Sequence, residues 1–411
     1  MVGCPNEVGE AYAYKADTTA YRNVLDLMLE DSEESIISFA KGFFRHYTFR
    51  NGIDNVIALL HSLDIKKYET VIVIPITVVP CACQSMWDYI KTLPNHIQKE
   101  YWTNLNVGII YEENAGFIVK KMIEYKRFDR ALDIIYHSSH KNFQFDTTII
   151  EETIIGIIKA SDSNLFSRMQ YELAKVVYLL DKREDANLQT LYSIEVLLYR
   201  LLEHHGNIND TKFIKEIMSN PESLMEIIDK TFLSSDENER AAEIEQVKND
   251  NSYALLGWHI FYTLRQTPFV DSNNTIDEVA LNNYIDQLQA LGNAKHKIKS
   301  VNTVIGELLG NYPETEGYPP IPICDIIERL NNKEVNNGFR TRLYNKRGVT
   351  VRPAYEGGTL EKNEADKYKK YADKIRYTHP IVCSIFDDLS RDYYQIAKNE
   401  DIRVKIEKME F

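Results

Sequence analysis

The chain has 411 residues, of which 44% are hydrophobic and 27% are charged, a composition that excludes a disordered protein. Its length predicts two domains or one long repeat array. With 48 basic and 61 acidic residues the formal charge is −13, so the chain as a whole repels a polyanion, and contact with nucleic acid requires a local basic patch.

The N-terminal residues lack the basic stretch and apolar core of a signal peptide. The longest uncharged run, residues 70–87, is short for a membrane span and contains Pro75 and Pro80. The five cysteines are an odd, sparse set that favours a reducing compartment. Cys81 and Cys83 supply only two of the four ligands of a structural zinc site. We therefore predict a cytoplasmic protein that contacts no membrane and holds no metal or cofactor.

Residues 1–233 show the apolar spacing of successive helices. One face is formed by Leu191, Ile194, Leu198 and Leu201, at positions i, i+3, i+7 and i+10. Pro221 after Asn220 indicates a helix start with a capping residue. The β-branched run at residues 71–74 precedes Pro75, and we interpret it as a buried helix end, with a buried strand as the alternative. Short polar connections predict an irregular α-solenoid, and a globular helical bundle remains open.

Residues 234–252 are predicted to be an acidic linker, either a loop or a solvated helix, because six carboxylates there face only Arg240 and Lys248. It separates the array from a C-terminal helical domain, residues 253–411. This domain begins with an amphipathic helix that contains Leu255, Leu256, Trp258 and Phe261. At its end, two apolar stripes separated by Thr378-His379-Pro380 predict a long antiparallel helix hairpin over residues 359–398. The fold class is therefore all-α.

Two spacings permit catalysis. One family of helical ribonucleases places an Arg four to six residues before a His on one helix, where they stabilise phosphorane charge and move a proton. Arg130 and His137 have six residues between them, and Arg200 and His205 have four. An apolar residue, Ala131 or Leu201, follows each Arg where that family has a polar one. Signatures of ATP hydrolysis, dinucleotide binding, zinc proteolysis and serine hydrolysis are absent from the sequence.

Residues 333–352 are predicted to be a basic loop that carries six cations and one carboxylate in an acidic chain. Glycines at 338, 348, 357 and 358 suggest sharp turns around it. Such a stretch can bind phosphate or an acidic protein surface. The alternative is internal pairing of its arginines with the acidic segment 356–373. The predicted partner-binding residues are Arg340, Arg342, Lys346, Arg347 and Arg352.

Residues 337–401 resemble the C-terminal region of a family of large bacterial multidomain proteins of the defence type. The resemblance is carried by Asn-Gly-Phe-Arg, by Tyr-Asn-Lys-Arg-Gly-Val-Thr-Val-Arg-Pro-Ala-Tyr-Glu-Gly-Gly and by Ala-Asp-Lys-Tyr-Lys-Lys-Tyr-Ala-Asp. It continues through Thr-His-Pro at 378–380 to Asp401. It implies a sensing or scaffolding part of an anti-phage assembly, whose enzymatic part is separate.

The sequence therefore predicts a non-enzymatic helical scaffold or sensor that binds a protein partner in bacterial defence. The partner would be a phage protein, a host protein or an enzymatic subunit of the same system. Two alternatives remain: a helical ribonuclease that uses one of the Arg–His pairs, and a nucleic-acid-binding scaffold that uses the basic loop.

Overall fold

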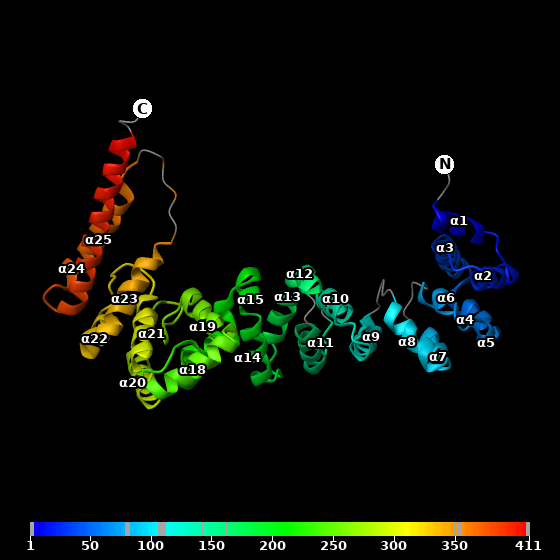
Figure 1. Ribbon diagram of the computed structural model, residues 1–411, viewed down its shortest axis with the longest axis horizontal. Helices are drawn as coiled ribbons and strands as arrows, with labels where there is room; N and C mark the ends of the chain where they lie inside the picture. Colours follow the sequence, from blue (N-terminus) through cyan, green and yellow to red (C-terminus); the bar gives the residue numbers. More distant parts are fainter. Residues whose placement is uncertain are drawn as a thin grey trace. The chain divides into compact units, whose positions relative to one another are not determined.

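The computed structural model describes residues 4–78, 83–105, 112–141, 143–160, 163–348, 351, 353 and 356–407. These residues form twenty-five α-helices and one short 3₁₀-helix, and they form no strand. A single antiparallel bridge, between Val270 and Ile276, is the one trace of β-structure in the described chain. The predicted all-α class is confirmed. The contacts divide the chain into two compact units, unit 1 (Met1–Gly206) and unit 2 (Asn207–Phe411), which we describe separately (Figure 1).

Unit 1 contains fifteen of the helices found in the described residues. They are α1 (Pro5–Ala13), α2 (Thr18–Glu30), α3 (Glu34–Asn51), α4 (Ile53–His61), α5 (Ile65–Tyr68), α6 (Val73–Thr77), α7 (Gln84–Lys91), α8 (Asn95–Asn104), α9 (Glu112–Glu124), α10 (Phe128–Ser139), α11 (Thr147–Ala160), α12 (Ser163–Arg168), α13 (Gln170–Asp181), α14 (Leu188–Leu197) and α15 (Tyr199–His205). Val73 and Ile74 of the β-branched run are the first residues of α6, and the helix continues through Pro75. The segment is therefore helical in part and the strand alternative is wrong, but the run starts a helix where the sequence predicted a helix end.

The helices of unit 1 pack on helices that are close to them in sequence. Helix α3 packs on α1, α2, α4 and α6, and α10 packs on α9, α11 and α13, as Figure 1 shows for the middle of the unit. Their apolar faces are buried, including Leu191 and Ile194 of α14. Such local packing is what a helical-repeat array requires. The α-solenoid itself stays a prediction.

Unit 2 contains ten α-helices in its described part. They are α16 (Lys212–Ser219), α17 (Pro221–Thr231), α18 (Glu237–Asn249), α19 (Ser252–Thr263), α20 (Glu278–Ala294), α21 (Ile298–Gly310), α22 (Ile321–Leu330), α23 (Lys333–Lys346), α24 (Thr359–Ile375) and α25 (Pro380–Glu407). As predicted, α17 starts at Pro221, and the Asn220 side chain accepts a hydrogen bond from the Glu222 amide (3.0 Å).

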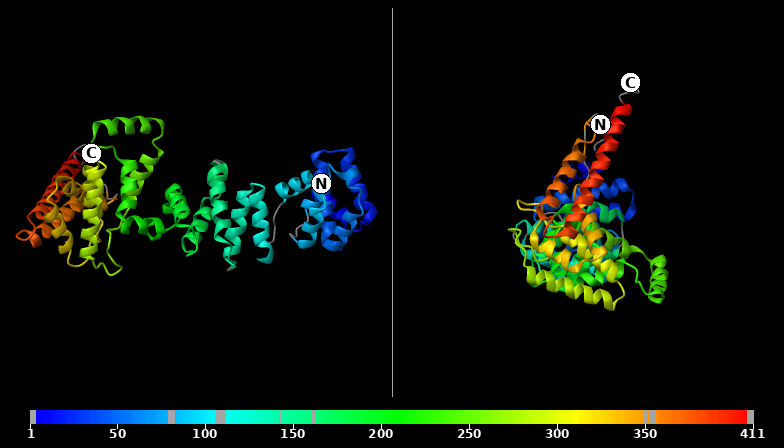
Figure 2. Two further views of the ribbon diagram at one scale, coloured as in Figure 1. Left: turned by 90° about the horizontal axis from the view of Figure 1, so that it is seen from below. Right: turned by 90° about the vertical axis from the view of Figure 1, so that its left-hand side faces the viewer.

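The boundary between the units differs from the predicted one. Helices α16 and α17, which the sequence placed in the array, belong to unit 2 because α17 packs on α19, α20 and α21. The Tyr284 hydroxyl of α20 also donates to the Ile217 carbonyl of α16 (2.5 Å). Residues 234–252 contain α18, which has no buried residue, so the segment is the solvated helix that the sequence offered as one option. Figure 2 shows α18 (green) standing off from its neighbours in unit 2.

The prediction of a basic loop over residues 333–352 is wrong for most of its length, because Lys333–Lys346 forms α23. Asn332 caps this helix by accepting from the amides of Glu334 and Val335. Gly338 lies inside α23, where it allows close packing against a neighbouring helix and does not form a turn. A β-carbon at Gly338 would lie 2.1 Å from the Thr303 carbonyl oxygen of α21, so the two helix backbones touch there. The glycine that suggested a loop is what allows α23 to pack against α21.

The predicted C-terminal hairpin corresponds to α24 and α25, which lie side by side (Figure 1). Ala365, Tyr368, Ala372 and Ile375 of the first stripe are buried. Tyr368 stacks on Tyr393 of α25, with the ring centroids 5.8 Å apart and the planes inclined by 9°. Glu328 of α22 accepts the first free amides of α25, those of Ile381 (2.7 Å) and Val382 (3.0 Å), which fixes the turn of the hairpin.

Candidate functional site

The two predicted Arg–His pairs lie on α10 and α15, where helical geometry separates their members. Arg130 pairs with Asp133 (3.1 Å) and contacts Asp129 (3.7 Å). His137 follows seven residues later, about 10 Å further along the axis of α10. Arg200 and His205 are five residues apart, so they point about 140° away from each other around α15. Arg130 is thus already engaged by two carboxylates, and a catalytic role of either pair stays a prediction.

The structure gathers rings from three helices that the sequence did not connect. The His137 ring lies 5.2 Å from the Tyr136 ring, and Tyr136 lies 6.2 Å from Tyr171 on α13. Tyr171 lies 5.9 Å from His205, whose ring is 4.8 Å from that of His204. No group of His, Cys, Asp and Glu side chains in the described residues has the arrangement of a metal site. The ring cluster therefore joins α10, α13 and α15 through aromatic contacts.

The predicted partner-binding residue Arg342 lies inside unit 2. Its side chain is buried, and its guanidinium donates to the carbonyls of Tyr262 (3.2 Å) and Leu264 and to the side-chain oxygen of Asn311. These acceptors belong to the C-terminal ends of α19 and α21, where carbonyl groups lack helical partners and the helix dipole is negative. Burial lowers the pKa of Arg342 to about 10. The residue caps the C-terminal end of α19 and holds the Asn311 side chain that follows α21, and the prediction that it meets a partner is not supported by its position.

The other predicted residues are also held internally. Lys346 donates to the carbonyls of Gly310 (3.5 Å) and Tyr312, and burial lowers its pKa. Arg347 forms a largely buried ion pair with Glu361 (2.8 Å), as the alternative interpretation expected. Arg340 pairs with Asp392 of α25. Arg352 lies outside the described residues, as does Cys81 of the cysteine pair.

A polar hollow of about 520 Å³ lies beside the end of α23. It is lined by Glu314, Lys346, Arg347, Leu360, Asn363, Glu364, Lys367 and Tyr368. Its cations are already bound: Lys367 pairs with Glu314 (3.2 Å) and Glu364 (2.6 Å), and Lys346 is held by carbonyls. An anion that entered the hollow would have to displace these contacts, so the hollow is not a prepared anion site.

The surface that stands out in unit 2 is one face of α19, which sequence reasoning missed. Leu255, Trp258 and Tyr262 are spaced i, i+3 and i+7, and their side chains are 53%, 55% and 66% exposed. We call these three residues the α19 face. The opposite face, with Ile260 and Phe261, is buried. The predicted helix therefore exists, but it is apolar on both its buried and its solvent side and is not amphipathic as predicted, and Leu255 and Trp258 face solvent.

The α19 face has a firm support. A β-carbon at Gly257 would lie 1.8 Å from Thr231 Oγ1, so α19 lies directly against α17. The Phe232 ring meets Trp258 edge-on, with centroids 5.0 Å apart. A helix that is apolar around its whole circumference must bury a second face or bind something. That all-round apolar pattern was the signal in the sequence from which the surface could have been found.

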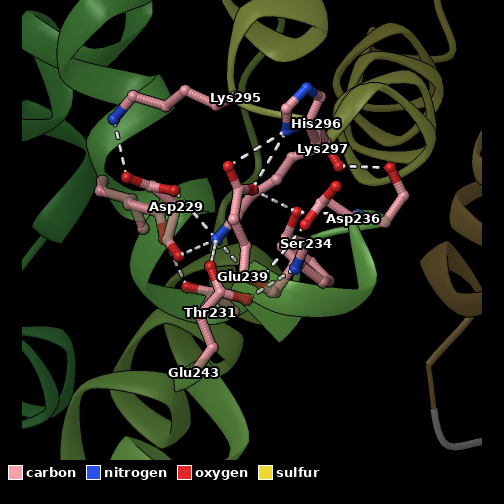
Figure 3. Close-up of polar contacts among 12 residues, drawn as sticks. Asp229, Thr231, Ser234, Asp236, Glu239, Glu243, Lys295, His296 and Lys297 are labelled. Atoms are coloured by element: carbon pink, nitrogen blue, oxygen red, sulfur yellow. Dashed lines mark hydrogen bonds and ion pairs between the residues drawn. The ribbon is translucent and has the colours of Figure 1, made fainter. Parts of the chain in front are cut away.

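A buried lysine fixes the turn between α17 and α18, next to this surface. Lys297 has a side chain only 1% exposed, and it lies between α20 and α21. Its ammonium group pairs with Asp229 (2.9 Å) and Glu243 (2.8 Å), and it donates to the carbonyls of Asp229 (2.5 Å) and Phe232 (2.8 Å) (Figure 3). It therefore closes the C-terminal end of α17 and holds α18 through Glu243.

Side chains around Lys297 complete this network, which we call the Lys297 network. The second oxygen of Glu243 accepts the Ser234 amide (2.6 Å), and Glu239 accepts the Ser234 hydroxyl (2.7 Å). The His296 ring lies 3.2 Å from both oxygens of Glu239, as Figure 3 shows. The hydrogen bonds of Ser234 and His296 lower the pKa of Glu239. The N-terminal half of α18 is thus tied to the body of unit 2 by polar contacts.

Comparison with protein-family models, with curated proteins and with solved structures finds no match for this chain. No helix in the described residues is long and apolar enough to cross a membrane.

Proposed function

We propose that this chain is a non-enzymatic helical scaffold that binds a protein partner through the α19 face. The observation that carries the proposal is the exposure of Leu255, Trp258 and Tyr262 on one rigid helix face. Trp and Tyr are enriched among the residues that dominate binding energy at protein interfaces. Burying one large apolar side chain fully is worth about 1.5–3 kcal/mol, so three half-exposed ones leave a substantial gain for a partner.

The α19 face, and not the basic stretch predicted from the sequence, is the proposed binding surface. Arg342 caps helix ends and Arg347 pairs with Glu361, so these cations serve the fold of unit 2. The α19 face instead presents side chains that are only partly covered. Phe232 meets Trp258, and the Arg265 guanidinium lies 5.9 Å from the centroid of the Tyr262 ring, but all three side chains remain more than half exposed. We place the scaffold in bacterial anti-phage defence, a context that rests on the resemblance of residues 337–401 alone.

The test compares a face variant with a matched control. The variant Trp258→Ser/Tyr262→Ser removes two rings of the α19 face, and Tyr377→Ser removes an aromatic ring that is 95% exposed at the α24–α25 turn. Affinity capture from cells that make the chain is followed by binding measurements with the purified partner. We expect a partner that the wild type and Tyr377→Ser bind, and that the face variant binds at least about tenfold more weakly.

Equal binding by all three proteins, with unchanged melting temperatures, would show that the α19 face is not the interface. The defence context is tested separately, by challenging cells that carry the wild-type chain or the face variant with phage. Equal plaque formation on cells with and without the chain contradicts that context and leaves the binding proposal intact.

A further inference from the structure

Helix α18, which precedes α19 in the chain, carries a net negative charge. Asp236–Asp250 contains six carboxylates and two cations, Arg240 and Lys248, so its net charge is −4. None of the residues of α18 is buried. Two of the six carboxylates, Glu239 and Glu243, belong to the Lys297 network. The others remain near solvent, where a partner can reach them.

The acidic helix is held in place relative to the α19 face. Its N-terminal half is tied down by the Lys297 network, in which Lys297 itself is almost completely buried. Its C-terminal end is joined to α19 by two residues, and the Asp250 carboxylate accepts the Ser252 amide (2.9 Å). A helix that buries no apolar side chain gains no packing energy of its own, so polar contacts must fix it. The C-terminal end of the acidic helix therefore lies next to the start of α19, whose first turn carries Leu255 of the α19 face.

Building on the proposed function, we infer that the partner contributes a basic amphipathic helix to this site. Its apolar side chains would cover Leu255, Trp258 and Tyr262, and its Lys and Arg side chains would face the carboxylates of α18. An amphipathic helix that lies on an apolar surface places anchors at positions i, i+3, i+4 and i+7, which matches the length of the α19 face. Cations also interact favourably with the faces of Trp and Tyr rings.

Charge argues against a second copy of this chain as the occupant. Each copy carries a formal charge of −13, and two acidic α18 helices brought together would repel. The basic stretch from 333 to 347 offers little to offset this, because Arg342 is buried, Arg340 pairs with Asp392 and Arg347 pairs with Glu361. A basic partner gains from the same charges that a second copy would have to overcome.

The test uses three synthetic peptides of about 18 residues, or five helical turns. The first is an amphipathic helix of Leu and Lys, the second has Glu in place of every Lys, and the third scrambles the first so that it has no apolar face. Isothermal titration calorimetry measures their binding to the full chain. We expect the basic amphipathic peptide to bind at least about tenfold more tightly than either of the others.

Two variants separate the apolar part from the charged part of the site. Trp258→Ser/Tyr262→Ser should abolish binding of the basic peptide. Glu237→Gln/Glu245→Gln should weaken binding of the basic peptide about three- to tenfold. The same variant should make binding less dependent on salt, because the screening length falls to about 3 Å at about 1 M salt and the lost carboxylates no longer contribute at low salt. The control Glu278→Gln/Glu316→Gln changes the net charge equally at exposed sites on other elements of unit 2 and should leave binding unchanged.

The outcomes distinguish the two proposals. If the acidic or scrambled peptide binds as tightly as the basic one, or if the control pair weakens binding as much as the α18 pair, the inference is wrong. The protein-binding function still holds in that case if the captured partner is lost only from the face variant. If that partner also binds the face variant normally, both proposals fail together. A gel-filtration mass of twice the chain, lost in the face variant, would identify a second copy as the occupant and overturn the inference.

Discussion

Helices α18 and α23 of unit 2 are both rich in charged residues, but α23 is packed into the unit and α18 is exposed to solvent. Helix α23 carries four cations and one carboxylate, yet Val335, Phe339, Arg342 and Leu343 are buried. Three of its cations, Arg340, Arg342 and Lys346, bind carbonyls or carboxylates of other segments. Helix α18 buries nothing and is held by contacts at its N-terminal half. The difference teaches that a run of charge does not reveal which helix faces solvent. Both helices have apolar and small residues between their charges, so the packing of α23 on α21 and α25, which α18 lacks, decides which one is buried.

The largest expected effect compares one arginine from each helix. Arg342→Glu places a carboxylate among the carbonyls of Tyr262 and Leu264, so we expect unit 2 to lose about 5 kcal/mol of stability or to fail to fold. Arg240→Glu on exposed α18 should change the free energy of unfolding by less than about 0.5 kcal/mol. Urea denaturation followed by circular dichroism measures both. Similar effects at the two positions would contradict the distinction between the helices.

The second prediction concerns what holds α18. Lys297→Met keeps the length of the side chain and removes the ammonium group, which leaves Asp229 and Glu243 without their buried partner. Because the side chains of Asp229 and Glu243 are 35% and 28% exposed, water can reach them, and we expect a cost of about 1–3 kcal/mol, below that of breaking a fully buried pair. We expect hydrogen exchange to speed up over residues 229–250 in this variant. Lys248→Met, which removes an exposed i,i+3 partner of Glu245, is the control and should leave exchange unchanged.

The third prediction tests the helix crossing that buries α23. Gly338→Ala forces a β-carbon to within 2.1 Å of the Thr303 carbonyl, so we expect a loss of about 1–3 kcal/mol. Gly116→Ala in α9 adds the same methyl group where no atom lies within 4 Å, and it should be neutral or stabilise by up to about 1 kcal/mol. Thermal melting measures both effects. A stabilising effect of Gly338→Ala would rule out the close contact between the backbones of α23 and α21.

The smallest expected effect depends on pH. Burial raises the pKa of Asp229, but hydrogen bonds from Lys295 and Lys297 outweigh it, so the pKa lies below the ordinary value. A carboxyl with a lowered folded pKa stabilises above its unfolded pKa, about 3.9, and that contribution is lost as the pH falls through the folded pKa. Because Asp229 is about a third exposed, the contribution is at most about 1 kcal/mol. Asp229→Asn should therefore show a shallower loss of stability than the wild type between about pH 4 and pH 2, measured by urea denaturation.

Apolar spacing with a period of 3.6 residues predicted the features that depend on residues within one helix. The all-α class, the start of α17 at Pro221 and the buried stripe of Ala365, Tyr368 and Ala372 follow from spacing within single helices. The boundary after Gly206 did not follow, because it depends on α17 packing against α19 and α20, which are distant in sequence.

The candidate site could be predicted only in part. The charges of residues 236–250 were visible in the sequence, whereas the buried Lys297 that organises them comes from a turn about 50 residues later. Gly338 illustrates the opposite error. A glycine in a sequence indicates either a turn or a close approach of two backbones, and only the position of α21 decides between them.

The position of Trp258 also allows intrinsic tryptophan fluorescence to report on the two units. The chain has three tryptophans, and Trp87 and Trp102 are buried in unit 1 while Trp258 is half exposed in unit 2. Buried indoles fluoresce at shorter wavelengths than hydrated ones, so the emission separates into a blue part from unit 1 and a red part from α19. Occupation of the α19 face would shift the red part alone, and melting of unit 1 would shift the blue part. One unlabelled sample thus reports on the two units independently.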